Sequence, residues 1–309
     1  MTERVDRTER AERTERAERM ERADRTECAK RMEHADRTEQ PDTAERTGET
    51  GGGAWLLETV AVSKRYVRDG RPLHVLDRVS LGVREGEFVS VVGPSGSGKS
   101  TLFRLIGGVE RPDEGMIRIA GRDVTGKRGL ISYMPQQPSL FPWLTVRQNI
   151  AFALAIAGID RKRAAALASE WLERIGLGDT AGAYPDELSG GMKQRVSFLR
   201  ALLMPRDVMC LDEPFAALDA LTRTRMQAWL LEQWEAHRRT VLLVTHSIEE
   251  AILLSDRIYV LGGPPAAVRR EIPVPLPRPR RPDVWNDPAF GRLREEILAL
   301  LGRSGGRDD

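Results

Sequence analysis

Two spacings of apolar residues divide the middle of the chain into expected strands and helices. Short apolar runs predict buried strands, and these runs fall at residues 55–62, 75–83, 88–92, 116–120, 131–134, 208–211, 241–245 and 258–261. We expect the run at 258–261 to be the last strand of the domain. From residue 145 to about residue 200 the spacing is helical, and Asp160 is the expected N-cap of a helix over residues 161–175.

The two ends of the chain differ in composition from residues 54–272. Residues 1–53 are a charged, low-complexity repeat with a period of three residues, and such a segment cannot form a core. We expect a disordered tail, with an interaction arm as the alternative. Residues 273–309 open with closely spaced prolines, typical of an extended linker. Asp287 and Pro288 then predict the start of a C-terminal helix, whose apolar face docks on its own domain or on a partner.

Net charge, cysteines and hydropathy exclude several classes of protein. The net charge of +2 is too small to indicate binding to nucleic acid or to an anionic membrane. Cys28 lies in the charged tail and Cys210 in an apolar run, so we expect no disulfide and a reducing cytoplasm. We expect no signal peptide and no membrane-spanning segment, which needs ~20 apolar residues. Any role at a membrane would therefore depend on a partner protein.

Residues 93–101 match the pattern G-x-x-x-x-G-K-[ST] of a phosphate-binding loop. A buried-strand run precedes the pattern and helical spacing follows it, so backbone N–H groups should gather at the positive end of a helix dipole. We expect Lys99 to reach the β- and γ-phosphates of a nucleotide, and the Ser100 hydroxyl to bind Mg²⁺. The expected phosphate-binding residues are Gly93, Pro94, Ser95, Gly96, Ser97, Gly98, Lys99, Ser100 and Thr101.

Polar residues that suit phosphate chemistry follow two other expected strands. Asp212 and Glu213 follow the run at 208–211, and adjacent carboxylates there suit one metal-binding Asp and one Glu that polarises water. His246 follows the run at 241–245 in the same way. Tyr66, between two expected strands, could stack on a purine ring or be a half-buried strand residue.

Residues 188–195, with the sequence Leu-Ser-Gly-Gly-Met-Lys-Gln-Arg, resemble the signature motif of ATP-binding cassette (ABC) ATPases. The resemblance covers roughly residues 57–302. It implies an α/β P-loop NTPase fold of the ABC ATPase type, with a mixed sheet core and an N-terminal antiparallel β subdomain. It also implies an inserted α-helical subdomain at about residues 137–200. The disordered tail at 1–53 has no counterpart in the family.

The resemblance assigns roles to residues at matching positions. It implies that Tyr66 stacks on adenine, that Gln136 of the Q-loop contacts Mg²⁺, and that Glu213 is the catalytic carboxylate. The implied catalytic residues are Glu213, His246, Lys99 and Gln136, and the implied metal ligands are Ser100, Gln136 and Asp212. The implied nucleotide contacts outside the phosphate-binding loop are Tyr66, Ser189, Gly190, Gly191 and Asp219 of the D-loop. The signature residues Ser189, Gly190 and Gly191 cap the γ-phosphate across a dimer.

Further stretches resemble the ATPase subunits of nitrate/sulfonate/taurine-type importers, a group that includes importers of thiamine-precursor pyrimidines. These stretches are residues 136–143, 184–185, 189–192 and 275–280. The short segment at 126–130 and Pro135 favour a pyrimidine or another small organic solute over a sulfonate.

The same resemblance implies cofactors, partners and a location. The cofactors are ATP and Mg²⁺. Two copies of the chain form a nucleotide-sandwich homodimer, with a pair of one copy and a close relative as the alternative. Integral membrane permease subunits dock near residues 137–195, beside Phe141, Pro142 and Trp143. A periplasmic or lipid-anchored solute-binding protein takes part indirectly, and no nucleic acid is involved. The chain would lie peripherally on the cytoplasmic face of the cell membrane.

Two other functions compete with an importer subunit. Soluble ABC ATPases of translation or DNA repair usually carry two cassettes or a long inserted coiled coil, and neither is evident in this sequence. A non-enzymatic nucleotide-binding regulator is the third possibility, and the presence of both Glu213 and His246 argues against it.

Overall fold

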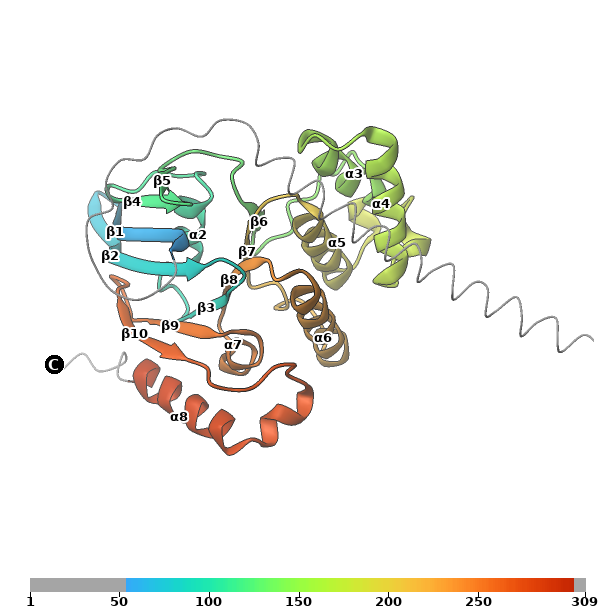
Figure 1. Ribbon diagram of the computed structural model, residues 1–309. Coiled ribbons are helices and arrows are strands. Elements are labelled where there is room, and N and C mark those ends of the chain that lie inside the picture. Colours follow the sequence, from blue (N-terminus) through green and yellow to red (C-terminus); the bar gives the residue numbers. More distant parts are fainter. Residues whose placement is uncertain (1–53, 303–309) are drawn as a thin grey trace, which may run out of the picture. The chain divides into compact units, whose positions relative to one another are not determined.

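A six-stranded, largely parallel sheet forms the centre of the computed structural model, which describes residues 54–302 (Figure 1). Its strand order is β10-β9-β3-β8-β7-β6. The strands are β3 (Phe88–Val92), β6 (Ser132–Met134), β7 (Val208–Asp212), β8 (Thr240–Thr245), β9 (Arg257–Leu261) and β10 (Val268–Pro273). Every residue of β3, β7 and β8 is buried, which explains why these strands are continuous apolar runs in the sequence.

A second, antiparallel sheet has the order β2-β1-β4-β5. Its strands are β1 (Trp55–Arg68), β2 (Arg71–Arg84), β4 (Glu114–Ile119) and β5 (Arg122–Asp123). The helix α2 (Lys99–Ile106) buries Leu102, Phe103 and Leu105 in one hydrophobic cluster with residues of both sheets. This arrangement confirms the predicted mixed sheet core and N-terminal antiparallel sheet. The predicted tail at residues 1–53 lies outside the described residues.

A helical segment follows β6, as the apolar spacing predicts. It contains α3 (Val146–Ile156), α4 (Arg161–Arg174), the short 3-10 helices η1 (Gly178–Thr180) and η2 (Pro185–Glu187), and α5 (Gly190–Leu203). The side chain of Asp160 caps α4 by accepting hydrogen bonds from the N–H groups of Lys162 and Arg163. The N-cap predicted from the sequence is therefore confirmed, because a carboxylate satisfies N–H groups that the first helical turn leaves free.

The expectation that residues 258–261 form the last strand is wrong, because β10 follows and pairs antiparallel with β9. Arg269, Arg270 and Glu271 are exposed on β10, so the strand has little of the apolar alternation that identifies a half-buried strand. Charged residues are typical of an edge strand, where they discourage pairing with other chains.

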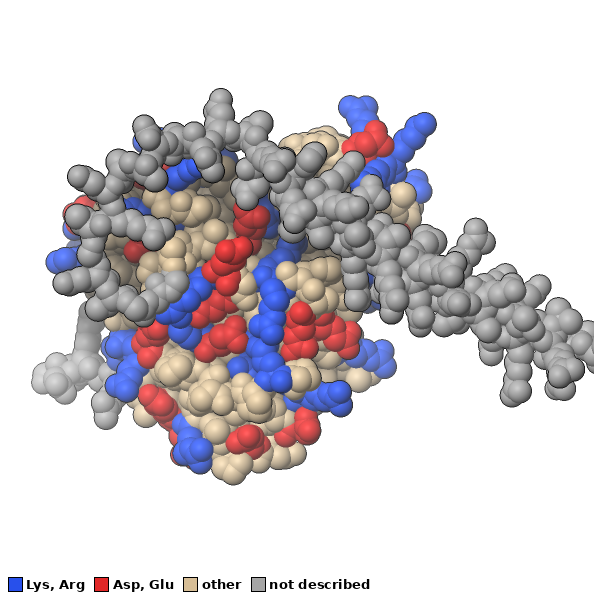
Figure 2. Space-filling model, in the orientation of Figure 1, with Lys and Arg blue, Asp and Glu red and all other residues tan. Residues whose placement is uncertain are grey.

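The C-terminal part packs against the same central sheet (Figure 1). It contains α6 (Ala220–His237), α7 (Ile248–Leu254), η3 (Pro282–Asn286) and α8 (Pro288–Gly302). The apolar face of α8 buries Phe290, Leu293 and Ile297 in a cluster that includes residues of α7. Figure 2 shows Lys and Arg side chains interspersed with Asp and Glu over this face of the molecule. None of the helices within residues 54–302 has the length and apolar character needed to cross a membrane.

Arg280 joins the proline-rich segment to the end of α7. Its guanidinium is buried and donates hydrogen bonds to the carbonyl of Ile252, at 3.0 Å, and to the carbonyl of Ser255. It also donates to the carbonyls of Val274 and Leu276 in its own segment. A cation at the C-terminal end of a helix satisfies free carbonyls and suits the helix dipole. Arg280 therefore fixes the end of α7, the helix that begins two residues after His246.

Candidate nucleotide-binding site

The loop between β3 and α2 has the backbone geometry of a phosphate cradle. Gly98 caps α2 with φ of +87°, in the left-handed region that glycine adopts readily. A Cβ at Gly98 would lie 2.8 Å from Cγ1 of Val75, so any side chain there would also collide with β2. The loop borders a cavity of about 420 Å³, whose lining residues are Val75, Ser95, Gly96, Ser97, Gly98, Lys99, Ser100, Thr101, Gln136 and Glu213.

The ammonium of Lys99 lies over the loop that precedes it. Nζ donates to the carbonyls of Gly93, at 2.9 Å, and Pro94, at 2.8 Å. Burial lowers the pKa of Lys99, while Glu213 and Asp212 oppose this shift. Nζ also donates to the hydroxyl of Ser97 at 3.4 Å, so its hydrogen-bond acceptors are all neutral. A buried cation of this kind beside an open cavity is well placed to take an anionic oxygen as a stronger partner.

Asp212, at the end of β7, has the properties of a metal ligand. Its side chain is 1% exposed and its Oδ1 has no hydrogen-bond partner among the described residues. Burial, together with the nearby charge of Glu213, raises the pKa of Asp212 to about 6, and hydrogen bonding from Ser100 opposes the shift. One carboxylate with one hydroxyl suits Mg²⁺, which completes its octahedron with water and phosphate oxygens. The residues therefore fit the metal predicted from the sequence.

Replacing Asp212 with asparagine should stabilise the nucleotide-free protein at pH 7.5. The raised pKa means that the folded state holds the proton more tightly than the unfolded state, so stability falls as the pH rises from about 4 to about 6. Asp212→Asn removes a buried charge and should add roughly 2 kcal/mol to the free energy of unfolding at pH 7.5, but little at pH 4. Thermal melts without nucleotide at both pH values measure this change.

Asp207→Asn is the matched control, because Asp207 is exposed just before the other end of β7. A loss of stability in Asp212→Asn at pH 7.5, or an equal change in the control, would contradict the account of the buried charge. Added Mg²⁺ and ATP should raise the melting temperature of the wild type much more than that of Asp212→Asn.

Glu213, Gln136 and His246 meet at the mouth of the cavity, as their predicted roles require. Oε2 of Glu213 lies 3.2 Å from Nε2 of Gln136 and 3.3 Å from Nδ1 of His246. The three side chains come from the end of β7, the segment after β6 and the end of β8. Glu213 itself has φ of +49°, a conformation that costs a non-glycine residue about 1–2 kcal/mol. The fold thus holds a carboxylate, an amide and an imidazole together beside the phosphate-binding loop.

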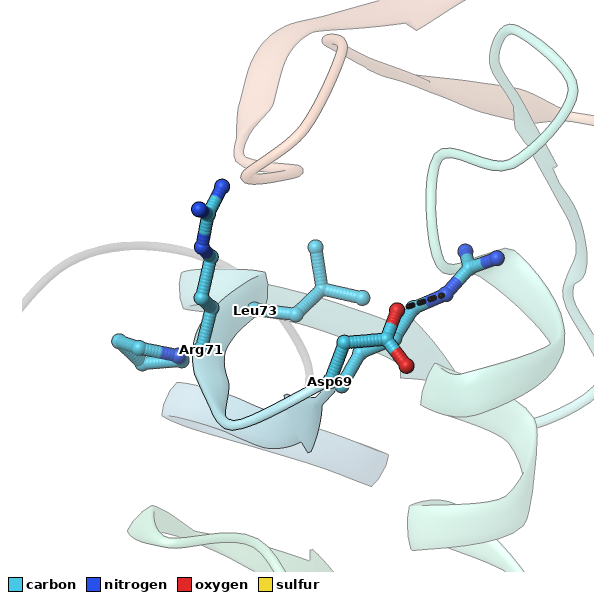
Figure 3. Close-up of a pocket in the computed structure, with 5 residues that line it drawn as sticks. Asp69, Arg71 and Leu73 are labelled. Atoms are coloured by element: carbon cyan, nitrogen blue, oxygen red, sulfur yellow. Dashed lines mark ion pairs between the residues drawn. The ribbon is translucent and has the colours of Figure 1, made fainter.

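Tyr66 lies on β1, outside the set of residues that line the cavity. Its hydroxyl donates a hydrogen bond to Glu110, and burial together with Glu110 raises its pKa. Beyond it, the turn between β1 and β2 forms a smaller hollow of about 340 Å³, lined by Arg68, Asp69, Arg71, Pro72 and Leu73 (Figure 3). These residues come from one exposed hairpin, so the cavity at the phosphate-binding loop remains the better candidate for a site.

The signature residues and Asp219 also lie away from the cavity of their own chain. Ser189 is the exposed N-cap of α5 and accepts a hydrogen bond from the N–H of Met192. Gly190 and Gly191 form the first turn of this helix. Asp219 caps α6 in the same way, and the N–H of Thr222 lowers its pKa. None of these residues is among those that line the cavity of their own chain.

No role was predicted from the sequence for two residues of the site. Val75 lines the cavity from β2, and one apolar residue in a strand gives no signal of such a position. Gln194 is buried in α5 and donates a hydrogen bond to the carbonyl of Glu213. It lies within the signature-like segment, which could have suggested a role, but its contact joins residues far apart in the sequence.

Comparisons with known proteins agree with this geometry. Residues 76–216 match the family model described as ABC transporter. The formylaminopyrimidine import ATP-binding protein ThiZ of Halalkalibacterium halodurans is 47% identical over 229 residues, which are 74% of this chain and 90% of that protein. The nitrate import ATP-binding protein NrtD of Synechocystis is 40% identical, over 79% of this chain and 94% of that protein.

A third relative and a solved structure extend the comparison. The taurine import ATP-binding protein TauB of Pseudomonas aeruginosa is 39% identical, over 78% of this chain and 94% of that protein. The ATP-binding cassette MJ0796, solved as a dimer in a post-hydrolysis state with ADP and Pi, has a TM-score of 0.65 and 31% identity. The match covers 71% of this chain and 99% of that one.

Proposed function

This chain belongs to the family of ABC transporter ATP-binding proteins, and we propose that it is the ATP-hydrolysing subunit of an importer for a small organic or anionic solute. The observation that carries this proposal is the cluster of Lys99, Asp212, Glu213 and His246 around one phosphate-binding loop, in a chain whose relatives are import ATPases. A regulator that only bound nucleotide would have no need of the carboxylate and imidazole at the cavity mouth.

The residues of the site would have separate roles in phosphoryl transfer. The N–H groups of residues 95–100 and the ammonium of Lys99 would hold the β- and γ-phosphates. Ser100, Asp212 and Gln136 would hold Mg²⁺, which supplies positive charge to the transferring phosphoryl group. Glu213 would orient the attacking water and accept its proton, and His246 would contact the γ-phosphate.

Two copies of the chain would enclose the nucleotides. Ser189, Gly190 and Gly191 lie at the N-terminus of α5, outside their own cavity, where free N–H groups suit an anion. In a sandwich dimer these N–H groups would face the γ-phosphate bound to the partner subunit, with Asp219 nearby. The dimeric state of the solved cassette supports this arrangement.

The surface beside the Q-loop supports docking of a membrane permease. Trp143 and Ile156 are each 70% exposed, and the rings of Phe141 and Phe152 meet edge to face at 5.5 Å. Exposed apolar side chains grouped in this way mark an interaction surface. Buried Asn149 fixes the loop, accepting from the N–H of Phe141 at 2.7 Å and donating to three carbonyls of residues 141–145. Asn149 thus ties the loop at residues 141–145 to the start of α3.

The relatives indicate the class of the solute and not its identity. ThiZ, NrtD and TauB are named for import of formylaminopyrimidine, nitrate and taurine. We infer a solute of this kind, delivered by a solute-binding protein to a permease, with the ATPase peripheral to the cytoplasmic face of the membrane. The short segment at 126–130 and Pro135 favour a pyrimidine within this class.

Affinity purification from detergent-solubilised membranes tests the importer proposal. The tagged wild-type chain should recover a multi-spanning permease, and Trp143→Ala should lose most of it, because the most exposed ring of the docking surface is removed. Trp285→Ala is the matched control, since Trp285 is 47% exposed in η3, outside this surface. Recovery of ribosomes or DNA-repair proteins without a permease would instead support a soluble ABC ATPase.

A further inference from the structure

Gln194 is buried in the helix that begins with the signature residues. It is 1% exposed and lies on α5, five positions after Ser189. Its Nε2 donates a hydrogen bond to the main-chain carbonyl of Glu213, with an N–O distance of 3.1 Å. A buried amide that reaches across to another segment is a specific contact, because a buried donor without its acceptor is unfavourable.

Glu213 needs such a contact because its backbone is strained. Its φ of +49° lies in the left-handed region, which a residue with a Cβ disfavours. Its N–H donates to the carbonyl of Val244 at 2.8 Å, and its carbonyl also accepts from the N–H of Ala216 at 3.2 Å. Hydrogen bonds thus hold the peptide groups on both sides of the Glu213 Cα.

The direction of the Glu213 side chain depends on this backbone conformation. The Cα–Cβ bond turns with φ and ψ, so a relaxed backbone would move Oε2 away from Gln136 and His246, which lie 3.2 Å and 3.3 Å from it. Catalytic groups lose much of their effect when they shift by about 1 Å. A residue that fixes the Glu213 carbonyl therefore also fixes its carboxylate.

We propose that Gln194 is a positioning residue, which holds Glu213 in its strained conformation and ties the carboxylate to α5. The inference rests on the proposed function, in which Glu213 orients the attacking water. In the proposed dimer, one end of α5 faces the nucleotide of the partner subunit, while Gln194 holds the carboxylate of its own subunit. A shift of α5 when the signature residues meet a nucleotide would reach Glu213 through this hydrogen bond.

Gln194→Met tests the proposal, because methionine has a similar length and high helix propensity but cannot donate a hydrogen bond. We expect kcat for ATP hydrolysis to fall about five- to tenfold, the effect of losing one hydrogen bond that acts on the transition state. The KM for ATP and ATP-driven dimerisation should stay within about twofold of the wild type, since the Gln194 side chain donates to the carbonyl of Glu213 and Gln194 is not among the residues that line the cavity. Gln194→Glu should lose more activity, because its carboxylate would face the carbonyl.

Ser197→Ala is the matched control on the same helix. Ser197 is buried, and its Oγ has no hydrogen-bond partner within the described residues, so kcat should stay near the wild-type value. An unchanged kcat in Gln194→Met would overturn the proposal. A fall in kcat accompanied by an equally large rise in KM would also overturn it. If the methionine variant does not fold, Gln194→Asn, whose amide is shorter by one methylene, serves the same comparison.

Glu213→Gln, measured in parallel, separates this inference from the proposed function. Full activity of Glu213→Gln would overturn the role of the carboxylate itself. Loss of activity in Glu213→Gln together with full activity in Gln194→Met would leave that role in place and overturn only the role of Gln194.

Discussion

Replacing Glu213 with glutamine should lower steady-state ATP hydrolysis by roughly 100-fold or more, the usual contribution of a positioned general base. The amide keeps the shape of the side chain but cannot accept a proton from water. Lys99 and the phosphate-binding loop are unchanged, so ATP should still bind, and the ATP-bound dimer should accumulate because hydrolysis no longer releases it. Phosphate release measures the first effect, and size-exclusion chromatography with ATP and Mg²⁺ measures the second.

Glu170→Gln provides the control for Glu213→Gln. Glu170 is a surface residue of α4, paired with Arg174, and its replacement should change neither hydrolysis nor dimerisation. Undiminished steady-state hydrolysis by Glu213→Gln would remove the role proposed for this carboxylate. A variant that hydrolysed slowly but formed no dimer with ATP would contradict the sandwich arrangement.

Replacing Lys99 with methionine should weaken ATP binding by roughly 10- to 100-fold, the range expected for one charge-assisted hydrogen bond. The effect on hydrolysis should be larger, because charge grows on the phosphoryl oxygens in the transition state. The loop itself should survive, since its turn is closed by a backbone hydrogen bond from the N–H of Ser97 to the carbonyl of Pro94.

A fluorescent ATP analogue and a phosphate-release assay measure the two effects of Lys99→Met. Lys127→Met is the control, because Lys127 is exposed and its Nζ donates to the carbonyl of Asp123. Equal losses of binding and of hydrolysis would mean that Lys99 acts on the bound ground state alone. Unchanged affinity would place the phosphates elsewhere than in the loop of residues 93–101.

The sequence predicts those parts of the molecule that local patterns determine. The phosphate-binding loop, its flanking strand and helix, and the cap at Asp160 depend on neighbouring residues, and each is found where the pattern places it. The strand pattern places Glu213 and His246 each after a buried strand, and the resemblance adds Gln136. The parallel sheet brings the three side chains within hydrogen-bonding distance.

Local sequence patterns do not predict contacts between segments that are far apart in the chain. The hydrogen bond from Gln194 to Glu213 joins residues 19 positions apart, and only the packing of α5 against β7 shows it. β10 was missed because exposed charges replaced the apolar alternation of a strand. The position of Ser189 outside its own cavity likewise follows from the fold and not from the motif.

The buried guanidinium of Arg280 has a practical consequence for where the chain can be cut. α7 has seven residues, too few for a helix to persist without support, and Arg280 occupies the carbonyls at its end. An excised cassette that stopped at β10 would lack both this arginine and α8, whose apolar face covers α7. The smallest fragment expected to fold and to keep His246 in its position therefore extends through residue 302, beyond the last strand of the sheet.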